Sequence, residues 1–238
     1  MTKKSSSQDR ALRIAVVGTG GVAQRNYLPF LAAQPDVAIA CYNRTPEKAE
    51  QAAKDFGGEA FATPAEIAAW KPTAALVLTA ETCRHEVGAE LIERGVPRVF
   101  FEKPLVAVNG QARVEEGDFF KGRELLDLAA SRKCETAMVF NYRFFEQSLA
   151  ARELVKTRKL GQVIGVAAQV HYACWSHVID LIHHFAGGVK EIAALSGPVE
   201  RTGDRVGTAR DVTAAFVTDD GAAGTIIGTA GMKWQHPL

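Results

Sequence analysis

A glycine-rich turn directly after a short apolar run is the feature that most constrains this chain. Ile14-Ala15-Val16-Val17 has the pattern of a buried strand, and Gly18-Thr19-Gly20-Gly21-Val22-Ala23 follows it at the start of a helical pattern. Gly18 permits a tight turn, Gly20 lets the backbone approach a ligand, and Ala23 is small enough for the helix to pack on the strand. Free N–H groups at the start of such a helix bind phosphate. The spacing therefore predicts a site for the pyrophosphate of a dinucleotide.

The rest of the first half alternates short apolar strands with helices. Strands are expected at residues 14–17, 37–41, 74–78 and 98–101, and helices at 22–33, 46–56, 65–70 and 86–94. This alternation is typical of parallel βαβ units with right-handed crossovers. We therefore expect an α/β fold whose first domain is a doubly wound parallel sheet of the Rossmann type.

The second half has a different pattern. A loop at 109–122 and a helix at 123–132 precede expected strands at 138–141, 163–172, 191–195, 212–218 and 223–228, with helices at 148–157 and 177–185. Asp219-Asp220-Gly221 predicts a hairpin turn between the last two strands. These features predict an α+β domain with a mainly antiparallel sheet. We expect a disordered tail at 1–10, a Rossmann domain at 11–130 and the second domain at 131–238.

Composition excludes several classes of protein. The 238 residues are 47% hydrophobic and carry a formal net charge of +1, which provides no basic surface for nucleic acid or an anionic membrane. The first ten residues lack the apolar core of a signal peptide, and no apolar run has membrane-spanning length, so a cytoplasmic protein is expected. The scattered cysteines are expected to be reduced, and His171, Cys174 and His177 lack the spacing of a zinc site. We expect no bound metal.

The end of the second predicted strand bears on the choice of nucleotide. An acidic residue there would bind the ribose 2′-hydroxyl of NAD, but the chain has Asn43-Arg44-Thr45. Asn43 brings no charge to repel a phosphate, and the Arg44 guanidinium can fork onto a 2′-phosphate. NADP(H) is therefore favoured over NAD(H). The alternative is that Thr45 only caps the next helix, with Pro46 at its first position, while Arg44 stays in solvent.

Five further segments resemble one family of enzymes. They are Thr79-Ala80-Glu81-Thr82-Cys83-Arg84-His85, Phe101-Glu102-Lys103-Pro104-Leu105, Phe140-Asn141-Tyr142-Arg143-Phe144, Lys159-Leu160-Gly161-Gln162-Val163 and His177-Val178-Ile179-Asp180. Their order resembles that of the glucose-fructose oxidoreductase and inositol dehydrogenase family (Gfo/Idh/MocA) from residue 11 to about 230. The resemblance implies oxidation or reduction of hydroxyl and carbonyl groups on sugars, polyols and related small molecules. It also places Thr79, Ala80 and His85 beside the cofactor.

The resemblance assigns the chemistry to two residues. Lys103 would lie at the carboxyl end of a parallel strand beside the nicotinamide, where its ammonium group can stabilise an alkoxide, and Glu102 could orient it. His177 is the candidate general acid and base, because an imidazole exchanges protons near neutral pH. On a helix, His177, Asp180 and His184 would form one polar stripe, and Asp180 could pair with His184 at i and i+4.

The chain also departs from the family. The family's common pattern places an aspartate four residues before the histidine, where this chain has Ala173, and the second domain is expected to be shortened. Tyr142, Tyr172 or Asp180 could take the place of that aspartate. The alternative hypothesis is a non-catalytic sensor or partner protein that binds NAD(P). A short-chain reductase is not expected, because no lysine has a tyrosine four residues before it.

The expected antiparallel sheet also bears on assembly. One face of such a sheet would be open, and sheets bury an open apolar face against a helix, another sheet or another subunit. The family's members commonly pair through this sheet. We therefore expect a homo-oligomer.

Overall fold

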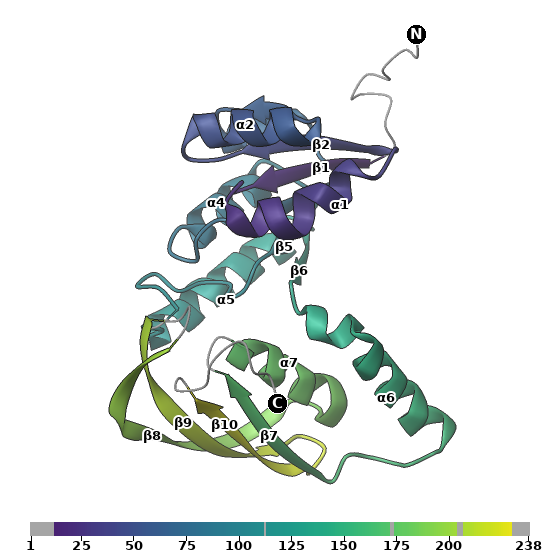
Figure 1. Ribbon diagram of the computed structural model, residues 1–238, viewed down its shortest axis with the longest axis vertical. Coiled ribbons are helices and arrows are strands. Elements are labelled where there is room, and N and C mark those ends of the chain that lie inside the picture. Colours follow the sequence, from purple (N-terminus) through teal and green to yellow (C-terminus); the bar gives the residue numbers. More distant parts are fainter. Residues whose placement is uncertain (1–11, 112, 172–173, 204–206, 230–238) are drawn as a thin grey trace. The chain divides into compact units, whose positions relative to one another are not determined.

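The computed structural model describes residues 12–111, 113–171, 174–203 and 207–229. The chain divides into two compact units, Met1–Val139 and Phe140–Leu238 (Figure 1). The predicted tail at 1–10 lies outside the described residues, as do Tyr172 and Ala173. None of the helices within the described ranges is long and apolar enough to cross a membrane.

The first unit contains a parallel sheet, as the alternating pattern predicts. Its strands pair in the order β3-β2-β1-β4-β5-β6, and each neighbouring pair is parallel. The strands are β1 (Leu12–Val17), β2 (Val37–Tyr42), β3 (Glu59–Phe61), β4 (Ala74–Val77), β5 (Arg98–Phe101) and β6 (Glu135–Met138). This order is that of a doubly wound Rossmann sheet.

Helices cover both faces of this sheet. They are α1 (Leu28–Ala32), α2 (Pro46–Phe56), α3 (Pro64–Ala69), α4 (Arg84–Glu93) and α5 (Glu116–Ser131). Neighbouring residues of β1 point to opposite faces, so that Val16 packs with α1 and α2 while Ala15 and Val17 pack with α3, α4 and α5. The strands in the middle of the sheet are therefore buried on both sides, which explains their unbroken apolar sequences.

Two helices differ from the expectation. The helix expected at 22–33 contains a π-helical turn, η2 (Ala23–Tyr27), in which the Leu28 N–H donates to the Ala23 carbonyl. Pro29 has no N–H to donate within the helix, which favours such an irregular turn. Helix α5 begins at Glu116 rather than at residue 123, because Glu115 and Asp118 form a capping box that offsets the unfavourable Gly117.

The sixth strand moves the boundary between the two units. The sequence placed a strand at 138–141 in the second domain and a boundary near residue 130. In the structure, β6 lies at 135–138 and pairs with β5 from Arg98↔Glu135 to Phe101↔Met138, and residues 141–144 form a 3₁₀ turn. The first unit consequently extends to Val139.

The second unit contains a four-stranded sheet with the order β7-β10-β9-β8. Its strands are β7 (Gly165–His171), β8 (Val189–Gly203), β9 (Gly207–Thr218) and β10 (Ala223–Thr229), and its helices are α6 (Glu146–Thr157) and α7 (Trp175–Ala186). The pairs β8–β9 and β9–β10 are antiparallel, whereas β7 and β10 are parallel. The expected mainly antiparallel sheet and the hairpin turn at 219–221 are confirmed.

Helix α7 covers one face of this sheet (Figure 1). Ile182 packs there with Phe216 and Ile226, which alternate along their strands with outward-pointing neighbours. The opposite face is exposed and consists largely of alanine, threonine and larger aliphatic residues, among them Ala193, Leu195, Thr213, Ala215, Val217, Thr225 and Ile227. Small and apolar side chains therefore predominate on the two middle strands of that face, with Glu191 beside Val217 and Gln169 beside Ile227.

Candidate active site

The glycine turn after β1 is fixed by a close approach between backbones. Gly18 has a φ of +99°, and a Cβ built on it would lie 2.7 Å from the Thr79 backbone nitrogen. Its N–H donates to the Tyr42 carbonyl at 2.7 Å. Gly18 therefore ties the end of β1 to the ends of β2 and β4 at once. No other residue type fits both the backbone conformation and the space.

The next part of the turn leaves room for a ligand. Gly20 is exposed, and a Cβ built on it would meet nothing within 4 Å, while the Gln24 N–H donates to the Gly20 carbonyl and begins the helix. Ala23 is fully buried against the strand, as the motif requires. Open space at Gly20 beside a helix N-terminus is the geometry that a pyrophosphate needs, so these residues fit a dinucleotide.

Two contacts around the turn were not predicted. The guanidinium of Arg25 lies against Gly21, with Nη1 2.8 Å from the position of a Cβ there. Thr19 is fully buried, and its hydroxyl donates to the Lys48 carbonyl at 3.0 Å. Nothing in the local pattern distinguishes either residue, because both contacts depend on how the turn folds back over its neighbours.

Asn43, which directly follows β2, forms a hydrogen bond with the glycine turn. Its Oδ1 accepts from the Thr19 N–H at 3.3 Å, and its Nδ2 donates to the Thr45 carbonyl at 3.2 Å. Arg44 is exposed. Thr45 is the N-cap residue of α2, and Pro46 is at the first helical position, as the capping alternative expects. The Thr45 side chain makes no capping hydrogen bond, so that part of the alternative is wrong.

The carboxyl end of β5 carries the Glu102-Lys103-Pro104 segment, with a cis peptide bond between Lys103 and Pro104. Glu102 Oε2 accepts from the Lys103 backbone N–H at 2.7 Å, and Oε1 is 3.5 Å from the Tyr27 hydroxyl, which donates to it. Burial and the Glu102 carboxylate raise the pKa of Tyr27. The Glu102 side chain therefore holds the backbone of Lys103, which is half-buried.

The loop after β4 lies next to this segment within the same sheet. Cys83 N–H donates to the Ala80 carbonyl in a turn that leads into α4. His85 is partly buried on α4, with Nε2 3.9 Å from Glu124 Oε2 on α5. The first unit thus brings the glycine turn, Asn43, the Thr79 loop and Lys103 together at the carboxyl edge of one parallel sheet, where open α/β sheets bind ligands.

In the second unit, His177 lies in the first turn of α7 within an aromatic cluster. Its imidazole stacks on the Tyr142 ring, with centroids 4.4 Å apart and planes inclined by 13°, and it meets the edge of Phe140 at 5.9 Å. The Tyr142 hydroxyl donates to the free thiol of Cys174 at 3.2 Å. Burial and this thiol raise the pKa of Tyr142. The plane of the His177 imidazole is therefore set by its contacts with Tyr142 and Phe140.

Asp180 has a different partner from the one that the helical spacing suggested. It accepts two hydrogen bonds from Arg143, with Nε–Oδ2 and Nη2–Oδ1 distances of 2.6 and 2.5 Å. The Nε2 atom of His184 lies 3.3 Å from Nη1 of Arg152 instead. Burial, together with the charges of Arg152 and Arg143, lowers the pKa of His184. The proposed Asp180–His184 pair is therefore wrong, because a forked guanidinium is the stronger partner for a carboxylate.

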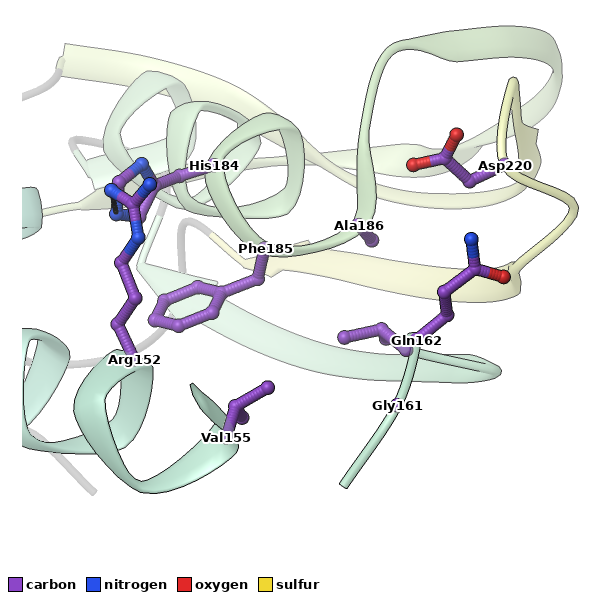
Figure 2. A pocket seen from close by; sticks show the side chains of 9 residues that line it. Arg152, Val155, Gly161, Gln162, His184, Phe185, Ala186 and Asp220 are labelled. Atoms are coloured by element: carbon purple, nitrogen blue, oxygen red, sulfur yellow. Dashed lines mark hydrogen bonds between the residues drawn. The ribbon is translucent and has the colours of Figure 1, made fainter. Parts of the chain in front are cut away.

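A cavity of about 260 Å³ lies at the other end of α7 from His177 (Figure 2). Figure 2 shows Arg152 and His184 together at one side and Gln162 and Asp220 at the other. None of the residues predicted from the sequence to act in catalysis lines it. Among the residues that the structure describes, no three His, Cys, Asp or Glu side chains are grouped to hold a metal ion.

Comparison with known proteins identifies the family. The model of an oxidoreductase family with an NAD-binding Rossmann fold matches residues 12–140. The chain therefore belongs to this family, Gfo/Idh/MocA. A curated relative, glucose-6-phosphate 3-dehydrogenase of Bacillus subtilis, is 22% identical over 160 residues, which are 67% of this chain and 42% of the relative. The match thus spans less than half the length of that relative.

Solved structures share the fold across both units. The WlbA dehydrogenase from Bordetella pertussis, solved with NADH and UDP-GlcNAcA, has a TM-score of 0.77 at 18% identity and covers 97% of this chain and 70% of its own. A myo-inositol dehydrogenase from Corynebacterium glutamicum has a TM-score of 0.71 at 19% identity, covering 93% and 69%. These likenesses confirm the predicted fold class.

The two glycines of the turn provide a matched test of the nucleotide site. Gly20→Ala should leave stability within about 1 kcal/mol, because its Cβ meets no protein atom, yet weaken binding of NADPH at least about tenfold by filling the phosphate space. Gly18→Ala should cost about 1–3 kcal/mol of unfolding free energy through backbone strain. Urea denaturation and NADPH fluorescence titration measure the two effects. Unchanged NADPH affinity in Gly20→Ala would contradict the assignment.

Proposed function

We propose that the chain is an NAD(P)-dependent oxidoreductase that moves a hydride between nicotinamide and a carbon bearing a hydroxyl or carbonyl group, in a sugar, polyol or related small molecule. The observation that carries this proposal is the placement of Lys103 in the same unit and at the same sheet edge as the glycine turn. A bound nicotinamide supplies the hydride acceptor or donor. The relatives' own substrates, sugars and a polyol by their names, support this substrate class.

Lys103 acts in this proposal as the group that stabilises charge on the substrate oxygen. Its ammonium donates a hydrogen bond to the hydroxyl and favours the alkoxide as the hydride leaves. Glu102 fixes the Lys103 backbone through the 2.7 Å hydrogen bond, and the Tyr27 hydroxyl in turn holds the other oxygen of Glu102. Thr79, Ala80 and His85 follow the neighbouring strand and would line the nicotinamide side of the cofactor site.

His177 acts as the general acid and base that exchanges the substrate's proton. Its orientation is supported by the stacked ring of Tyr142, and Tyr142 is held in turn by Cys174. The Arg143–Asp180 pair joins the turn that carries Tyr142 to α7. Asp180 and Tyr142 thus support His177 by positioning it. The non-catalytic alternative is not favoured, because the family is one of oxidoreductases.

NADP(H) is the proposed cofactor, in preference to NAD(H). Support comes from the end of β2, where Asn43 is neutral and both of its amide atoms are engaged with backbone. Position 43 thus has an amide where a carboxylate would bind the ribose 2′-hydroxyl of NAD. Arg44 follows it and is exposed at the surface, so its guanidinium can bind a 2′-phosphate.

We also propose that two or more copies of the chain associate through the exposed face of the second sheet. Leu195 is 80% exposed, and Ile227 and Val217 are 41% and 39% exposed on that face. Between them stand small residues such as Ala215, which pairs with Ala193 and Thr225 across the strands. A face of small and apolar residues suits an identical face of a second copy, since a twofold axis places the same residues opposite one another.

Loss of the Lys103 ammonium should abolish turnover without loss of cofactor. With a panel of ketosugars and polyols, Lys103→Met should lower kcat at least about 10³-fold while the Kd for NADPH changes little, because the ammonium acts on the transition state. His177→Phe, which keeps a ring on Tyr142, should lower kcat about 10²–10⁴-fold. Tight NADPH binding without turnover of any member of the panel by the wild type would overturn the enzymatic proposal.

Removal of the Arg44 guanidinium should change the preference between cofactors. In Arg44→Ala, the NADPH affinity should fall about tenfold, while the NADH affinity stays within about twofold, because only NADPH carries the 2′-phosphate. Fluorescence titration gives both dissociation constants. Arg98→Ala, at the amino end of β5, is the matched control and should change neither. An equal loss of affinity for both nucleotides would contradict the assignment.

A charge in the middle of the exposed sheet face should separate the copies. Ala215→Asp should convert the oligomer to monomers, because association would bury an unpaired carboxylate. Size-exclusion chromatography with light scattering measures the mass. Ala150→Asp on the exposed side of α6 is the control and should leave the mass unchanged. A wild-type chain that elutes as a monomer at micromolar concentration would refute this interface.

A further inference from the structure

The first residue of α4 is a buried arginine whose function is not explained by its helix. Arg84 is only 3% exposed. Its Nη2 donates to the Thr79 carbonyl at 2.5 Å, and its Nη1 donates to the Pro104 carbonyl. Removing a guanidinium from water is costly unless its N–H groups find acceptors. The two carbonyls accept from Nη1 and Nη2, whereas the buried Nε has no hydrogen-bond partner among the described residues, so the stability of the buried arginine depends on the two loops.

These two carbonyls belong to loops that carry different parts of the site. Thr79 follows β4, whereas Pro104 follows β5, and the two strands are paired up to Val77↔Phe101. Beyond that point the strand ladder has ended, and two backbone hydrogen bonds join the segments, from the Glu102 N–H to the Val77 carbonyl and from the Ala107 N–H to the Glu81 carbonyl. Neither of them holds Lys103 or Pro104. Arg84 joins the two loops two to three residues past the last pair, immediately after Lys103. A fork of fixed geometry can do this, whereas a single ammonium group cannot hold two separate acceptors in the same way.

The charge of Arg84 also has a partner in the segment that carries Lys103. Burial lowers the pKa of the Arg84 guanidinium, while the carboxylates of Glu102 and Glu81 oppose that shift. Glu102 is the residue that accepts hydrogen bonds from the Lys103 N–H and the Tyr27 hydroxyl. Arg84 therefore interacts electrostatically with the residue that holds the Lys103 backbone.

We propose that Arg84 is a positioning residue, which fixes the loop carrying Lys103 against the loop after β4. The inference rests on the proposed function for its catalytic consequence, although the contact itself does not. Loss of the fork should let residues 102–108 move relative to the glycine turn. Because a displacement of about 1 Å can cost about 10²-fold in rate, kcat should fall by that order while nucleotide affinity changes less.

The experiment uses the full chain and three variants. Arg84→Ala removes the fork, Arg84→Lys keeps the charge without the fork, and Arg94→Ala removes an exposed arginine from the end of the same helix. Hydrogen exchange of residues 102–108, the Kd for NADPH and the kcat on the best substrate of the panel are measured for each. Arg84→Ala and Arg84→Lys should exchange at least about tenfold faster in 102–108, and Arg94→Ala should match the wild type.

Chemical rescue separates positioning from a general loss of stability. Methylguanidinium added to Arg84→Ala should slow the exchange of 102–108 and restore part of kcat, whereas methylammonium at equal ionic strength should not. A purely structural role would not give this result, because guanidinium salts weaken folded proteins. If Arg84→Ala fails to fold, Arg84→Lys provides the same exchange and kcat comparison.

The failures of the two proposals are distinguishable. Wild-type exchange in 102–108 for both Arg84 variants would overturn the positioning role, whatever the activity. Faster exchange with unchanged kcat would overturn its catalytic consequence. Absence of turnover in the wild type would overturn the proposed function, while exchange and its rescue by methylguanidinium would still decide whether Arg84 holds the loop.

Discussion

The contact of Gly18 with the backbone after β4 is the constraint on which the rest of the nucleotide-binding unit depends. One residue without a side chain lets three strand ends meet, because its N–H donates to the carbonyl of Tyr42 at the end of β2 and its Cα lies against Thr79 after β4. The loops after these strands then share one edge of the sheet. The candidate site is consequently a result of strand packing, and the residues that perform chemistry are added to an edge that the core already defines.

The sequence predicted most of the first sheet because its central strands are buried on both faces and so have continuous apolar sequences. The two edge strands lack such sequences. One of them was therefore not predicted, and the other was predicted at the wrong residues. β3 was not expected, since Glu59 and Ala60 are exposed, and β6 begins at an exposed Glu135 that no apolar pattern marks. The start of α5 was concealed by Gly117 and Gly122, and it is set by a capping contact between two acidic residues.

Some residues of the candidate site can be predicted from local sequence motifs, whereas others depend on contacts between distant parts of the chain. The glycine turn and the Lys103 segment have motifs whose meaning is local, and the structure places them at one edge. Asp180 shows the limit of such reasoning, since its partner Arg143 stands 37 residues away in sequence. Arg84 shows it too, because a charge next to a helix start ordinarily lies in solvent, and only the surrounding loops reveal that it is buried.

The two hydrogen bonds of Asn43 link traits that are often treated as separate. The Asn43 amide occupies the position of a ribose-binding acid. It also stabilises the glycine turn, because it accepts a hydrogen bond from the Thr19 N–H and donates one to the Thr45 carbonyl. An aspartate there could still accept from Thr19 but would face the Thr45 carbonyl with a second acceptor. An acid at position 43 would therefore require compensating changes in the turn itself, so the residue at this position and the geometry of the turn are expected to evolve together.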